Sequence, residues 1–199
     1  MEHFAAARPL VACALAGLAA LAGGCATSYP GTPFGMGMGA PSAAPVPVMP
    51  ARFTAAERDF ATRAAAKGMY EVEVSKLAAD RAINPGVRSY AQAMVVHHTQ
   101  ANKELVALMS ARGVAPPKGL AADRATKLHR LASLPPSAGF DHGYVRVVGV
   151  EDHRANIAAF ERARRDVNDR DLKAWIDRVL SVMRGHLATA ESLSASLAG

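Results

Sequence analysis

The chain has 199 residues, half of them hydrophobic and 6% of them aromatic, and its formal net charge is +6. A basic chain with few aromatic side chains and no base-reading motif argues against nucleic acid as a partner. Its two cysteines, Cys13 and Cys25, both lie near the amino terminus. The rest of the chain therefore has no disulfide and no thiolate ligand.

Residues 1–24 have the pattern of a lipoprotein signal peptide. The apolar run Leu10–Leu21 is about a dozen residues long, whereas a bilayer crossing needs about 20. Small residues then precede Cys25 in a stretch that resembles the lipobox of bacterial lipoproteins. The resemblance implies cleavage before Cys25 and a diacylglyceryl group on its sulfur. Because Ala26 follows, it also implies the periplasmic side of the outer membrane. The alternative is ordinary cleavage and a soluble periplasmic protein.

Residues 25–52 are rich in proline, glycine, alanine and methionine and carry almost no charge. Such a composition cannot form a core, so we expect a lipidated, flexible tether that holds the following domain away from the membrane.

Residues 53–199 form one domain in which apolar residues recur every three or four positions, which predicts an all-α class. A capping box at Thr54–Glu57 begins the first helix, and Asn84 followed by Pro85 begins the second. We expect helices over about residues 54–82, 85–112, 120–134, 137–166 and 169–193. Short turns make each long pair an antiparallel hairpin. The predicted fold is an up-down-up-down four-helix bundle with a short extra helix in the crossover between the second and third long helices.

Each long helix carries one ionisable side chain in the middle of its apolar stripe. These four residues are Glu71, His98, His153 and His186. At about 1.5 Å of rise per residue, counting from the hairpin turns places Glu71 level with His98 and staggers the other two by about 4.5 Å. We therefore expect all four in one layer of the bundle. The remaining histidines of the domain lie off the stripes and are expected at the surface: His97, His129 and His142.

Several short motifs along the domain form a recognisable set. They are Gly68-Met69-Tyr70-Glu71-Val72, Lys76-Leu77-Ala78, Met94-Val95-Val96-His97-His98-Thr99, Phe140-Asp141-His142-Gly143-Tyr144 and His186-Leu187. Over nearly all of residues 53–193 the chain is similar to the bacterial family called domain of unknown function 4142. The resemblance implies a ferritin-like bundle that is exported and often labelled an outer-membrane protein. That family commonly has aspartate where this chain has His97, so the chemistry at this position differs.

Three imidazoles and one carboxylate suit a single transition-metal ion, such as zinc, copper, iron or manganese. A di-iron centre of the ferritin type is disfavoured, because its Glu-x-x-His motif is replaced by Val95, Val150 and Met183 before the three histidines. Met94 and Met183 are further candidate ligands, for copper, and we expect both toward the same end of the bundle. Methionine at helical spacing is also ordinary core filler.

Two classes of function remain open. The first is a lipid-anchored envelope bundle with a mononuclear metal site in its core. The second is a non-catalytic structural or interaction module whose Glu/His cluster is only a hydrogen-bonded network, because buried charge must be paired. An enzyme is the weakest alternative, since no substrate pocket can be identified. Arginines on the last two helices make anionic envelope components a further candidate partner, although solvated helix faces carry arginine anyway.

Overall fold

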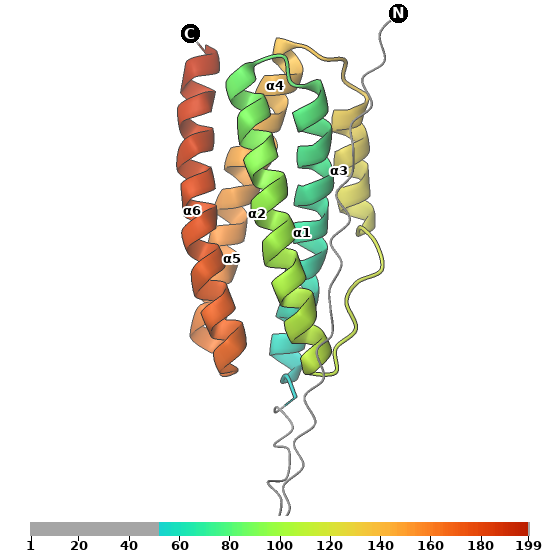
Figure 1. Cartoon of the computed structure of the whole chain (residues 1–199), viewed down its shortest axis with the longest axis vertical. Helices are drawn as coiled ribbons and strands as arrows, with labels where there is room; N and C mark the ends of the chain where they lie inside the picture. The colour runs from blue at the N-terminus through green and yellow to red at the C-terminus, as the bar shows by residue number, and fades with distance from the viewer. Residues whose placement is uncertain (1–51, 199) are drawn as a thin grey trace, which may run out of the picture. The chain divides into compact units, whose positions relative to one another are not determined.

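The computed structural model describes residues 52–198, and every regular element in this range is helical (Figure 1). The elements are α1 (Ala55–Arg81), α2 (Pro85–Ala111), α3 (Ala122–Ala132), α4 (Ala138–Tyr144), the π-helix η1 (Val145–Asp152), α5 (His153–Asp166) and α6 (Arg170–Ala198). The predicted all-α class is confirmed. The expected signal peptide, the lipidation site Cys25 and all but the last residue of the expected tether lie outside the described residues.

Local signals set the helix ends close to their predicted positions. At α1 the Thr54 hydroxyl accepts a hydrogen bond from the backbone N–H of Glu57, and the Glu57 carboxylate accepts one from the backbone N–H of Thr54. Asn84 caps α2, with Pro85 in its first turn. Gly113 follows α2 at φ 72°, in the left-handed region that favours glycine. None of the described helices combines the length and the apolar character that a bilayer crossing requires.

The order of helix directions differs from the predicted up-down-up-down order. The helices α1 and α2 are antiparallel, as expected. The connection that contains α3 then carries the chain back to the end where α2 begins, so that α4, η1 and α5 run parallel to α2 (Figure 1). Only α6 returns in the direction of α1. The prediction was wrong because it treated α3 as a step between neighbouring helix ends, whereas α3 is part of a long crossover along the bundle.

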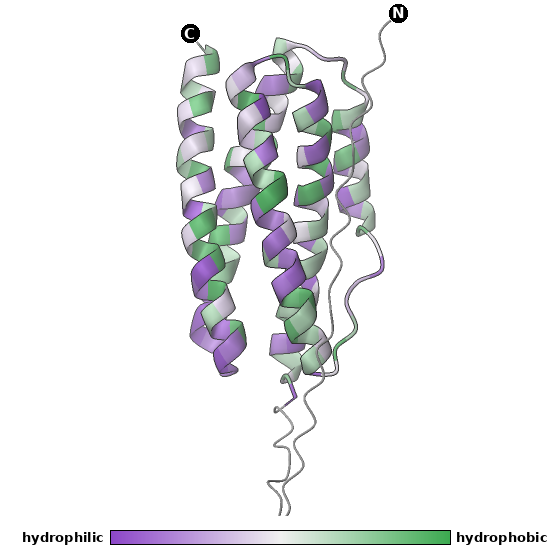
Figure 2. Ribbon diagram, in the orientation of Figure 1, coloured by the Kyte–Doolittle hydropathy of each residue, from purple (hydrophilic) through white to green (hydrophobic). Residues whose placement is uncertain are grey.

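Two apolar clusters fill the interior. We call the first the phenylalanine cluster: it includes Phe60, Phe160 and Trp175, and it joins the beginnings of α1 and α6 to the ends of α2 and α5. We call the second the tyrosine cluster: it includes Tyr90 and Tyr144 and lies toward the opposite end. Figure 2 shows hydrophobic and hydrophilic residues alternating along the helices, as expected when each helix buries one face.

The π-helix η1 changes which residues face inward just before α5. A π-turn takes in more residues than an α-turn, so it shifts the register of the helix that follows. Asp152, the last residue of η1, and His153, the first residue of α5, are both buried. Gly149 allows α6 to approach η1 closely, because a Cβ at this position would lie 2.7 Å from the Cβ of Ala190.

Candidate metal centre

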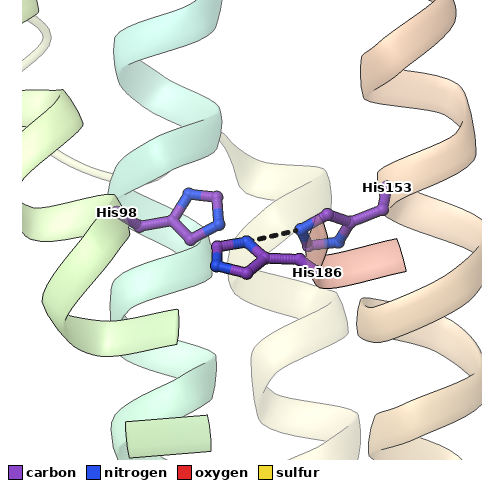
Figure 3. A group of neighbouring side chains, drawn as sticks. All are labelled: His98, His153 and His186. Atoms are coloured by element: carbon purple, nitrogen blue, oxygen red, sulfur yellow. Dashed lines mark hydrogen bonds between the residues drawn. The ribbon is translucent and has the colours of Figure 1, made fainter. Parts of the chain in front are cut away.

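The structure brings together all four residues of the predicted layer. Glu71 comes from α1, His98 from α2, His153 from the start of α5 and His186 from α6, and all four are buried. Each of the three histidines offers one ring nitrogen, and these nitrogens lie within 4.8 Å of one another. Figure 3 shows the three imidazoles directed toward a common region between the helices.

The nitrogens of the three histidines lie close enough together to hold one small ion, and Glu71 lies beside two of them. Glu71 Oε2 lies 2.9 Å from His98 Nε2 and 4.0 Å from His153 Nε2. His153 Nε2 in turn lies 3.3 Å from His186 Nδ1. Atoms bound at about 2.0–2.1 Å in a tetrahedral site are about 3.3 Å apart, so small side-chain movements would place these donors around one ion. Glu71 adds its carboxylate on the side of His98 and His153.

Two of the candidate metal-ligating atoms are buried without a well-directed hydrogen bond. Glu71 Oε2 and His98 Nε2 are close in distance, yet neither meets hydrogen-bonding geometry with any partner among the described residues. The two atoms form an ion pair when His98 is protonated. When His98 is neutral, both are left without a partner, which costs about 1–3 kcal/mol and is rare in native proteins. A cation between them would satisfy both atoms.

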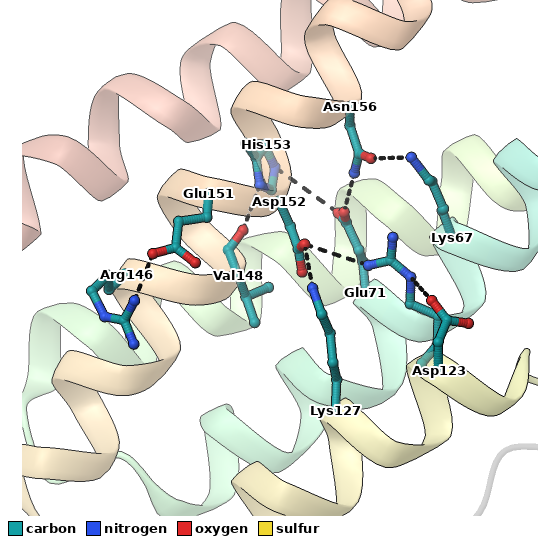
Figure 4. A network of polar contacts seen from close by, with 11 residues as sticks. Lys67, Glu71, Asp123, Lys127, Arg146, Val148, Glu151, Asp152, His153 and Asn156 are labelled. Carbon is teal, nitrogen blue, oxygen red and sulfur yellow. Dashed lines mark hydrogen bonds and ion pairs between the residues drawn. The ribbon is translucent and has the colours of Figure 1, made fainter.

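His153 is held in the orientation that a ligand needs. Its Nδ1 lies 2.9 Å from the carbonyl oxygen of Val148 in η1 (Figure 4). A carbonyl only accepts hydrogen bonds, so Nδ1 carries the proton, and in the neutral ring Nε2 presents a lone pair to the layer. A backbone carbonyl on the far nitrogen is a common support for metal-binding histidine.

A chain of polar side chains orients Glu71. Its Oε1 accepts a hydrogen bond of 2.6 Å from the Asn156 amide, whose oxygen accepts one of 2.8 Å from the ammonium group of Lys67 (Figure 4). Burial alone would raise the pKa of Glu71, but the positive charge of the His98 and His153 imidazoles in their protonated form outweighs burial and lowers it to about 2. The carboxylate is therefore ionised and available as a ligand.

His186 is paired with a histidine that sequence reasoning placed away from the site. His97 is exposed, as expected, but its Nδ1 lies 2.8 Å from His186 Nε2, and the two rings stack with centroids 5.1 Å apart. Burial, together with the nearby imidazoles of His98 and His153, lowers the pKa of His186 to about 3. His186 is therefore neutral, as a ligand must be.

The two methionines lie on opposite sides of the layer. Met94 belongs to the tyrosine cluster and Met183 to the phenylalanine cluster. The expectation that both lie toward one end is wrong, because α2 and α6 run in opposite directions. Met183 lines a cavity of about 30 Å³ together with Glu71 and His98. The other two histidines named above, His129 and His142, are exposed as expected.

Sequence reasoning also missed the buried Asp152, which precedes His153. Its Oδ1 lies 2.9 Å from the ammonium group of Lys127 and 3.4 Å from the guanidinium group of Arg124, both on α3 (Figure 4). The sequence pattern predicted one continuous α-helix here, and the π-helix that ends at Asp152 changes which of its residues face inward. The ion pairs fix the crossover helix beside the site.

Comparison with known proteins places the chain in a family. The family described as Domain of unknown function (DUF4142) matches residues 42–193, which is more than half of the chain. A solved structure of a DUF305 fragment from Deinococcus radiodurans is similar, with a TM-score of 0.64 and 16% identity, and the match covers 74% of this chain and 99% of that chain. At this identity the likeness shows the fold alone. No curated protein matches. The chain belongs to the DUF4142 family.

Proposed function

We propose that the layer binds a single transition-metal ion, namely zinc, copper, iron or manganese. The ligands are the imidazoles of His98, His153 and His186 and the carboxylate of Glu71. The observation that carries this proposal is the pair of buried donor atoms, Glu71 Oε2 and His98 Nε2, that face each other at 2.9 Å without a well-directed hydrogen bond.

The contacts behind the ligands support the same proposal. The carbonyl of Val148 and the ring of His97 hold the outer nitrogens of His153 and His186. Asn156 holds the outer oxygen of Glu71. Such outer contacts fix the orientation of the ligands, which raises metal affinity about 10–100-fold.

The site also has room for a small further ligand. The cavity of about 30 Å³ beside Glu71 and His98 is large enough for one water molecule. A bound ion with an exchangeable water supplies Lewis-acid or redox chemistry. The residues of this chain hold that position open between Glu71, His98 and Met183.

We place this metal-binding bundle in the cell envelope. The support is the signal pattern of residues 1–24, followed by Cys25 and an uncharged, proline-rich stretch. Cys25 would carry the lipid on the periplasmic side of the outer membrane. Radiolabelled palmitate incorporated into the wild-type chain and lost in Cys25→Ser tests the anchor. A chain cleaved without lipid would instead be soluble in the periplasm.

Elemental analysis tests metal binding directly. The chain from residue 26 onward, made without affinity histidines, should retain up to one transition-metal ion per molecule and should bind one ion in titration. The double variant His98→Ala/His186→Ala should lose this binding. The matched control His129→Ala/His142→Ala removes two exposed imidazoles and should bind as the wild type does.

The rival function is a structural or interaction module whose polar layer is only a hydrogen-bonded network. It gives the opposite result in the same experiment. The wild-type chain would then bind no ion at saturating zinc or copper, and the double variant would differ from it in stability alone.

A further inference from the structure

A groove of about 210 Å³ opens on the face formed by α2 and α6. Its lining includes two histidines of α2, His97 and His98, and two residues of α6, Val182 and Met183. It lies over the more accessible side of the site. His98 and His186 retain 8% and 6% exposure, whereas Glu71 and His153 retain 1% and 0%.

The groove borders the site. The cavity of about 30 Å³ beside Glu71 shares four lining residues with the groove: His98, Ala101, Val179 and Met183. Glu71 lines only the cavity, so movement of the His98 or Met183 side chain would bring an ion from the groove to its carboxylate. The two apolar clusters cover the layer at both ends, and Asn156, bonded to Lys67, lies behind Glu71.

His97 stands at the mouth of this groove. It is exposed, and its Nδ1 lies 2.8 Å from His186 Nε2, so the two rings form a pair that reaches from solvent to the buried layer. The carboxylate of Glu104 at the rim is already engaged, at 2.8 Å by the Gln100 amide and at 3.3 Å by the guanidinium group of Arg178. The donors along the groove are therefore imidazole nitrogens and a thioether.

We propose that the groove between α2 and α6 is the route by which the ion enters and leaves, and that His97 is the first residue to bind it. His98 and His186 then take the ion inward to Glu71 and His153. Imidazole and thioether donors select zinc and copper over magnesium and calcium. This inference depends on the proposed metal site.

Exchange kinetics test the route. Loading of the metal-free chain with Zn²⁺ or Cu²⁺ is followed by stopped flow, and removal is followed after addition of a chelator. His97→Ala should slow loading by more than about ten-fold, because the first binding step is lost. Removal should slow less, because the variant also loses the contact that His97 makes with His186 and so binds the ion more weakly.

A second variant blocks the route without touching a ligand. Val182 lines the groove and is 41% exposed, so Val182→Trp fills the groove without disturbing the core. It should also slow both rates, whereas His142→Ala, on an exposed part of α4, should change neither.

Three results would overturn the proposal. Unchanged rates in both His97→Ala and Val182→Trp would mean that the ion uses another route. A loss of affinity above about ten-fold in His97→Ala with unchanged loading would make His97 a residue that only positions His186. Absence of binding in the wild-type chain would overturn the metal site itself together with its route.

Discussion

Helix α1 buries two glutamates whose surroundings are very different. Glu57 is 4% exposed and Glu71 is 1% exposed. The oxygens of Glu57 accept hydrogen bonds from the backbone N–H groups of Thr54, Asn168 and Asp169, each at 2.8 Å. Glu71 Oε1 accepts one hydrogen bond, from the Asn156 amide, and Glu71 Oε2 faces the imidazoles of His98 and His153.

The comparison distinguishes a structural carboxylate from a candidate ligand. Backbone N–H groups fully compensate the charge of Glu57 and tie the start of α1 to the turn between α5 and α6. Glu71 instead faces ring nitrogens of His98 and His153, which bind metal ions in their unprotonated form. A metal cation placed between the Glu71 carboxylate and the imidazoles would be bound by both groups. Equal burial therefore does not imply an equal role.

The largest difference is expected in metal affinity. Glu71→Gln removes the only carboxylate among the four proposed ligands and should weaken metal binding by more than about 100-fold, beyond the roughly 10–100-fold effect of outer contacts. Glu57→Gln makes the same chemical change on the same helix and should leave affinity unchanged. Competition titration against a chelator measures both, and equal affinity in the two variants would remove Glu71 from the site.

For the stability of the metal-free chain, the change at Glu57 should have the larger effect. Glu57→Ala leaves the part-buried backbone N–H groups of Asn168 and Asp169 without their partner and removes the glutamate half of the capping box of α1. The free energy of unfolding should fall by about 2–4 kcal/mol, with metal affinity retained. Urea unfolding of the metal-free chain provides the measurement. A change below about 0.5 kcal/mol would show that these hydrogen bonds do not stabilise the junction.

Acid should remove the contribution of Glu57 to the free energy of unfolding. Burial by itself raises the pKa of Glu57, but the hydrogen bonds from Asp169, Thr54 and Asn168 outweigh burial and hold it below the usual value. A carboxyl group with a lowered folded-state pKa stabilises the protein above its unfolded pKa of about 4.3 and loses this effect as pH falls through the folded value.

The measurement is the difference in unfolding free energy between the wild-type chain and Glu57→Gln. This difference should be constant near neutral pH and should shrink below about pH 4.3. A difference that grows on acidification has the wrong sign for this mechanism.

The smallest effects are expected at the methionines. Met94→Leu and Met183→Leu nearly conserve volume and should each cost less than about 1.5 kcal/mol of stability. Neither should change the equilibrium affinity for zinc, because the four proposed ligands need no sulfur. A loss of copper affinity in Met183→Leu alone would add its thioether to the ligand set.

The sequence was sufficient to predict the helices and the polar layer. Apolar periodicity and caps such as Asn84 act within one helix, and the heights of Glu71 and His98 can be counted from a tight turn. The helix directions were not predictable in this way, because they depend on how far the α3 crossover runs.

The same limit explains the residues that were missed. Whether the exposed ring of His97 also contacts another side chain depends on which helix lies beside α2. Asp152 is the last residue of the π-helix, so its direction depends on a departure from the α-helical period. Packing between helices decides both features, and a pattern read along one helix contains no information about it.

Anomalous diffraction at the absorption edge of zinc or copper tests the central claim most directly. Crystals of the loaded chain should show one strong peak within about 2.0–2.3 Å of donor atoms of His98, His153, His186 and Glu71. A peak at exposed histidines such as His142, with none inside the bundle, would contradict the account.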